Sequence, residues 1–169
     1  MCSLVIGCST SVESNYSNWN FESIRYQNEL YLIQTDDRFG EWGGNTYLIR
    51  VYRENQTAQL LLDYKEFEGK PGPPQPPHPD SITTTILELL EHEPVLNKKN
   101  RIKANESHLK LIAGAIQELM EISINNSEYV TMSGVVNRVL NSDSSLNIVD
   151  YPSTNWEKFQ TLRNKIEKE

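Results

Sequence analysis

The chain has 169 residues, enough for one hydrophobic core but too few for two. Its composition, 37% hydrophobic and 23% charged, is that of a folded protein and excludes disorder over most of the chain. The net charge of −7 repels phosphate backbones, so we expect no nucleic-acid partner; it suits a basic protein partner, and ordinary solubility explains it equally well. No apolar run reaches the roughly 18–20 residues that span a bilayer.

Both cysteines, Cys2 and Cys8, lie at the N-terminus. The remainder of the chain therefore holds no disulfide framework, no thiolate-ligated zinc and no thiol nucleophile. Cys8 ends the segment Leu4-Val5-Ile6-Gly7-Cys8, and a polar stretch rich in Ser and Asn follows it. This segment resembles the lipobox of bacterial lipoproteins, in which aliphatic residues and a small residue precede the cysteine that is lipidated.

The resemblance implies that Cys8 is the lipidation site, and that residues 1–20 are a signal remnant and a polar tether. It also implies a lipid anchor in the cell envelope, on the periplasmic or surface side. The segment departs from the family pattern, because a signal has a basic n-region and about 7–15 apolar residues. Here residues 1–7 precede Cys8 and contain no Lys or Arg. In the alternative interpretation the segment is a buried strand, Cys8 is a core thiol and the protein is cytoplasmic.

Residues 22–67 alternate between apolar and polar side chains, which predicts an antiparallel meander of three or four strands. The expected strands are 23–27, 30–35, 46–53 and 58–67. Prolines crowd residues 70–80 and cannot donate the hydrogen bonds of a sheet, so we interpret this stretch as a stiff connector. A short helix with an apolar stripe is expected over residues 82–90.

The clearest helix in the second half of the chain is predicted from Asn105 or Ser107 to Asn125, where apolar residues recur at 3.6-residue spacing. A second β-hairpin is expected between residues 129 and 150, around a turn at 141–145. The basic residues ahead of the helix are interpreted as a solvated loop. They are Lys98, Lys99, Arg101 and Lys103.

The C-terminal segment has the pattern of an amphipathic helix. Thr154 and Glu157 fit a capping box at its start. Its apolar stripe consists of Trp156, Phe159, Leu162 and Ile166. The expected fold is therefore a single α+β domain over residues 21–169, with an antiparallel β-meander, one central amphipathic helix, a second β-hairpin and a C-terminal helix.

The densest polar cluster is the turn at residues 35–45. Its candidate binding residues are Asp36, Asp37, Arg38, Glu41 and Trp42. With Asn45 the carboxylates could offer oxygens to calcium, but their spacing does not match an EF-hand, so no metal site is expected. Turn geometry alone explains the Asp and Gly content. A tryptophan flanked by glycines would instead make an anchor for a protein contact.

Sequence signatures of catalysis are missing. No two histidines have the helical spacing of a metal site, and no nucleophile elbow or phosphate-binding glycine loop occurs. The neighbouring carboxylates of the turn have nothing to separate their pKa values, as acid–base catalysis requires. We therefore expect no cofactor, no catalytic residue and no enzyme activity.

These features favour a membrane-tethered, extracytoplasmic protein-binding module without catalysis. The most specific version of this hypothesis is an immunity- or inhibitor-type protein that neutralises a toxin or enzyme. The acidic surface would attract a basic partner of this kind. One alternative is a structural or envelope-accessory lipoprotein, which would have the same composition. A further alternative is a hydrolase that uses Asp36, Asp37 or Glu41.

Overall fold

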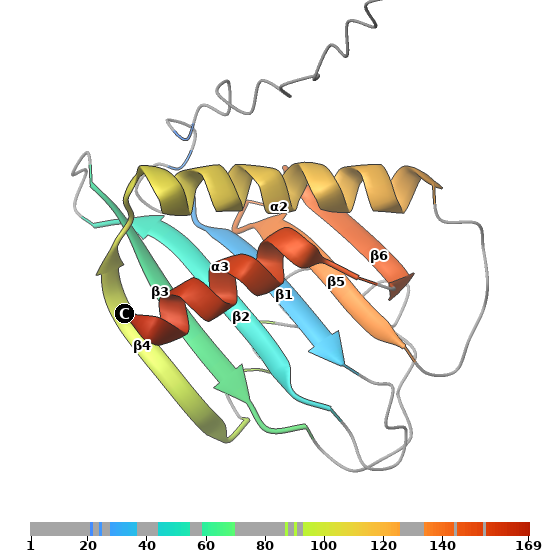
Figure 1. Ribbon diagram of the computed structural model, residues 1–169, viewed down its shortest axis with the longest axis horizontal. Helices are drawn as coiled ribbons and strands as arrows, with labels where there is room; N and C mark the ends of the chain where they lie inside the picture. Colours follow the sequence, from blue (N-terminus) through green and yellow to red (C-terminus); the bar gives the residue numbers. More distant parts are fainter. Residues whose placement is uncertain are drawn as a thin grey trace, which may run out of the picture.

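The computed structural model describes residues 21, 24, 28–36, 44–54, 59–69, 87, 90, 93–125, 134–143, 145–153 and 155–169. Within these residues, six strands form one antiparallel sheet and two helices lie on one of its faces (Figure 1). The strands are β1 (Leu30–Asp36), β2 (Thr46–Arg53), β3 (Leu60–Phe67), β4 (Val95–Lys103), β5 (Val135–Asn141) and β6 (Asn147–Ser153). The helices are α2 (Glu106–Asn125) and α3 (Glu157–Lys168). This arrangement confirms the predicted α+β fold.

The strands lie in the order β4-β3-β2-β1-β5-β6, so the first strand is in the middle of the sheet. β1 to β4 form a meander, and β5 then pairs with the free side of β1. Because β4 and β5 run in the same direction, the chain needs a crossover between them, and α2 is part of it. The predicted hairpin is present as β5 and β6, and its turn is where the sequence indicated.

The basic run is a strand and not the solvated loop that the sequence suggested. It forms β4, where Lys98 and Lys65 are direct partners and Ile102 lies opposite Leu62. Most β4 side chains are exposed because the strand lies at the edge of the sheet. Its sequence therefore lacks the alternation of apolar and polar residues from which a strand is predicted. Lysines on an edge strand also discourage pairing with another chain.

The N-terminal part of the predicted meander is only partly described. Ile24 is buried but belongs to no strand, and residues 25–27 lie outside the described part of the chain. Of the expected short helix, Leu87 and Leu90 are described and have helical backbone conformation. The proline-rich connector also lies outside the described residues.

The main core fills the space between the sheet and the two helices. All four residues of the predicted C-terminal stripe are fully buried there, which confirms the stripe. Trp156 stacks on Phe159 with ring centroids 4.5 Å apart, and its indole N–H donates to the Ala115 carbonyl at 2.7 Å. Full burial of an apolar side chain of this size stabilises the fold by about 1.5–3 kcal/mol.

The predicted capping box at the start of α3 is wrong. The N-cap residue is Trp156, which makes no side-chain capping hydrogen bond, and Thr154 lies outside the described residues. α2 begins as expected, because the Asn105 side-chain oxygen accepts a hydrogen bond from the His108 backbone N–H at 3.0 Å. No helix in the described ranges has the length and apolar character needed to span a membrane.

Candidate functional site

The turn at residues 35–45, which holds the predicted binding residues, begins at the end of β1. The Asp36 backbone N–H donates to the Asn45 carbonyl at 3.2 Å, so β1 and β2 are joined up to the base of the turn. Asn45 is engaged in the fold, since its amide donates to Glu66 at 2.8 Å and its amide oxygen accepts the Gly69 N–H at 3.4 Å. The other predicted site residues lie outside the described part of the chain. They are Cys8, Asp37, Arg38, Glu41 and Trp42.

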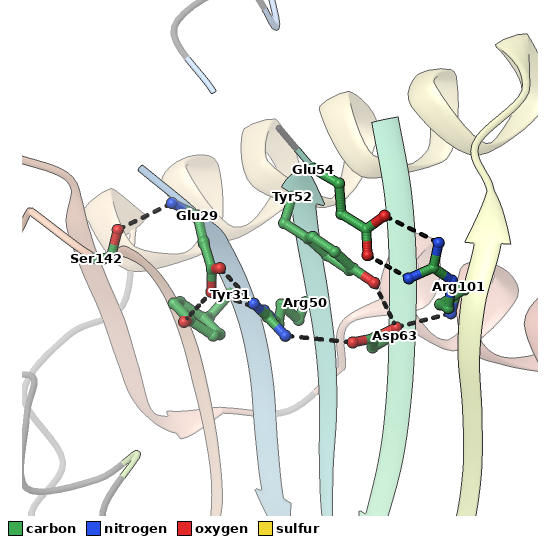
Figure 2. A network of polar contacts seen from close by, with 8 residues as sticks. All are labelled: Glu29, Tyr31, Arg50, Tyr52, Glu54, Asp63, Arg101 and Ser142. Carbon is green, nitrogen blue, oxygen red and sulfur yellow. Dashed lines mark hydrogen bonds and ion pairs between the residues drawn. The ribbon is translucent and has the colours of Figure 1, made fainter. Parts of the chain in front are cut away.

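A second candidate site lies on the sheet face opposite α2 and α3, which we call the open face. Side chains alternate along each strand, so the neighbours of the core residues point to this face. Its apolar residues form a second, smaller cluster on which Leu87 and Leu90 pack. The cluster consists of Ile33, Leu48, Phe67 and Leu140. Beside this cluster, charged side chains from several strands meet in one network (Figure 2).

Arg50 on β2 is the centre of the network. Its guanidinium donates two hydrogen bonds to the Glu29 carboxylate, one of them at 2.6 Å, and a third to Asp63 at 3.4 Å. The Tyr31 hydroxyl also donates to Glu29, and the Glu29 backbone N–H donates to the Ser142 hydroxyl oxygen at 2.9 Å. The Arg50 guanidinium lies 4.2 Å above the ring of Tyr52. These contacts hold Arg50 in one position on the open face (Figure 2).

Asp63 on β3 connects this centre to the edge strand. Its carboxylate accepts hydrogen bonds from the Tyr52 hydroxyl at 3.1 Å and from the Arg101 backbone N–H at 2.8 Å. Arg101 has φ of 59°, in the left-handed region, where β4 bulges against β3. Its guanidinium donates two hydrogen bonds to the Glu54 carboxylate, the longer at 2.9 Å. The network therefore runs across β1, β2, β3 and β4.

The network moves the pKa values of Glu29, Tyr31 and Tyr52 away from neutrality. Burial opposes ionisation of Glu29, but the hydrogen bonds from Arg50 and Tyr31 outweigh it and lower the pKa of the carboxyl. Burial and the hydrogen bond to Glu29 raise the pKa of Tyr31. Burial and the nearby Asp63 raise the pKa of Tyr52 to about 12. A general acid or base works best with a pKa near the working pH, so these groups are held as fixed charges and dipoles.

A pocket of about 280 Å³ lies on the open face beside the network. Part of its lining is charged or polar: Glu29, Tyr31, Arg50, Asp63 and Lys65. The remainder is apolar: Leu48, Phe67, Leu87 and Leu90. A concave site in which apolar side chains lie beside polar groups in fixed positions is a candidate for ligand recognition.

Sequence reasoning missed this site because its residues come from separate strands, and only pairing of the strands brings them together. The available signal was that apolar residues flank Arg50 and Asp63 within their strands. In the part of the chain that the structure describes, no group of three or more His, Cys, Asp or Glu could hold a metal. No protein-family model, curated protein or solved structure matches this chain.

Proposed function

We propose that this protein is a binding module without catalysis, which engages a protein partner through the open face of its sheet. The main support for the proposal is the network around Arg50, which presents partly exposed charges in fixed positions. The Arg50 side chain is 35% exposed and the Arg101 side chain 65% exposed. Side chains that are already held in position lose less conformational entropy when a partner binds.

Exposed apolar residues border the same face. Val95 on β4 lies opposite Phe67, and Val149 on β6 lies opposite Arg138, so the two residues are at opposite edges of the sheet. They are 44% and 41% exposed. In the proposed interface, the exposed apolar residues would supply contact and the fixed charges would orient the partner.

We further propose that the module is lipid-anchored through Cys8 outside the cytoplasm and acts as an immunity- or inhibitor-type protein. The lipobox-like segment supports the anchor, and the net charge of −7 would speed encounter with a basic toxin or enzyme.

The location is tested by labelled-palmitate incorporation in the native cells. Labelling of the wild type that vanishes in Cys8→Ala supports the anchor. Equal labelling of both, or labelling of neither, overturns it and makes the cytoplasmic alternative the better one.

The interface is tested by capture of partners from the native cells with two charged variants. Val95→Arg combined with Val149→Arg places charges on both edges of the open face, and should abolish capture of the partner. Ile124→Arg is the matched control, because Ile124 is an exposed apolar residue on α2, 78% exposed, on the other side of the molecule. Loss of capture in the α2 variant alone would assign the interface to the helices. Failure of the wild type to retain any partner would favour an accessory lipoprotein.

A further inference from the structure

The pocket on the open face offers an apolar surface between the sheet and a helical segment. Leu48 and Phe67 belong to the sheet, and Leu87 and Leu90 pack against them from outside it. At the other end of the pocket the carboxylates of Glu29 and Asp63 both turn toward Arg50. Those three charged groups therefore satisfy one another before any ligand arrives.

Lys65 is different from the other charged residues of the pocket. It lies on β3 between Asp63 and Phe67, and alternation along the strand puts all three on the open face. No hydrogen bond or ion pair joins its ammonium group to any other described residue. The pocket thus has one cation whose charge is not compensated by the described part of the fold.

Lys98 adds a second cation next to Lys65, just outside the residues that line the pocket. It is the direct antiparallel partner of Lys65 on β4 and is exposed. Side chains of directly opposite residues lie on the same face, with Cβ atoms about 4.5–5.5 Å apart, and like charges in such positions destabilise a sheet. No described carboxylate pairs with Lys98 either. An anion bound between the two ammonium groups would remove their repulsion.

We propose that this pocket binds a monoanionic amphiphile, an alkyl or aryl carboxylate. Its carboxylate lies between Lys65 and Lys98, and its apolar body packs on the four apolar lining residues. The volume of about 280 Å³ suits a small ligand. Lysines act as point charges that suit a compact anion, and the arginine of the pocket, Arg50, already binds two carboxylates. The inference does not depend on the protein partner proposed above.

The first test is calorimetric titration of the purified full-length protein with decanoate and with decanol, each below its micelle-forming concentration. Decanoate should bind at least about tenfold more tightly, because only its head group makes charge-assisted contacts. Lys65→Gln and Lys98→Gln should each weaken decanoate binding by about tenfold. Lys103→Gln is the control, since Lys103 is exposed on the same strand but lies opposite Leu61, which does not line the pocket, whereas Lys98 lies opposite Lys65, which does. Equal binding of the two ligands, or no binding of decanoate, would overturn the proposal.

A second variant separates ligand binding from folding. Lys98→Glu places opposite charges at the cross-strand position and should raise the Tm, while it removes half of the anion site and weakens decanoate binding. A variant with the higher Tm and unchanged decanoate affinity would contradict the proposed position of the carboxylate. Lower affinity at the higher Tm would support it, since loss of fold cannot then explain the loss of binding.

Discussion

The carboxylate of Glu118 on α2 accepts a hydrogen bond from the backbone N–H of Glu157, the first residue of α3, at 2.9 Å. Its second oxygen accepts the N–H of Lys158 at 2.8 Å. Glu118 thus supplies the cap that α3 lacks in its own sequence, and places a negative charge at the positive end of the helix dipole.

Replacement of Glu118 by Ala should therefore lower the free energy of unfolding by about 1–2 kcal/mol, in the range of a lost N-cap. Glu118→Gln should cost less, because one oxygen still accepts a hydrogen bond. Urea unfolding of both variants checks this. Glu121→Ala, an exposed change one turn further along α2, should have a smaller effect. Equal losses for Glu118→Ala and Glu121→Ala would show that the cap does not stabilise α3.

Arg101 has a backbone conformation that glycine adopts more easily than other residues, with φ of 59°. Arg101→Gly should therefore be more stable than Arg101→Ala by about 0.5–1 kcal/mol, although both lose the exposed ion pair with Glu54. At Lys99, an ordinary position of the same strand, alanine should be more stable than glycine. Thermal unfolding of the four variants tests this reversal, and the same order at both positions would contradict it.

Gly114 lies in the interior of α2, where a Cβ atom would meet the Lys158 side chain at 3.5 Å, an ordinary van der Waals distance. Glycine in a helix interior costs about 0.8–1 kcal/mol relative to alanine. Gly114→Ala should therefore raise the free energy of unfolding by roughly 0.5–1 kcal/mol, because the Lys158 chain accommodates the methyl group. Denaturant unfolding measures the change. A loss of stability would mean that α2 and α3 pack more tightly than this distance implies.

His108 makes the stability depend on pH. Its ring is fully buried, Nδ1 accepts the Asn105 backbone N–H at 3.3 Å, and Nε2 lies 3.2 Å from a carboxylate oxygen of Glu169. Burial lowers the pKa of His108. The carboxylate of Glu169 acts to raise this pKa, and the charge of Lys165 acts to lower it further. The unfolded chain then takes up the proton at higher pH than the folded chain. The stabilisation from the neutral ring is complete above about pH 6.5 and is lost as the pH falls through the lower, folded pKa.

The measurement is the free energy of unfolding in urea between pH 8 and pH 5 for the wild type and His108→Gln. The wild type should lose stability more steeply as the pH falls below 6.5, by up to about 1.4 kcal/mol per pH unit. The glutamine variant cannot take up a proton at this position and should lack that part of the slope. Parallel curves would show that His108 titrates equally in both states.

Some features of the candidate site could not be predicted from the sequence. Glu29, Arg50 and Asp63 lie on separate segments, and no local sequence pattern indicates that they contact one another. Their contacts exist because β1 pairs with β2 and β2 with β3 in one particular register. The turn at residues 35–45 could be proposed as a binding site because its polar residues are adjacent in sequence.

The sequence by itself determined the elements whose side chains divide into a buried and an exposed set. β2 begins at Thr46 and ends at Arg53 as predicted, and the stripe from Trp156 to Ile166 is buried, because apolar periodicity is a local property that burial enforces. Only the tertiary structure decided the features that depend on neighbours distant in sequence. β4 is a strand because β3 pairs with its backbone, and α3 is capped by Glu118 from another helix. The hydrogen bonds of β4 join backbone groups and carry no side-chain pattern, and the Glu118 cap joins residues about 40 positions apart, so neither feature could be predicted from the sequence.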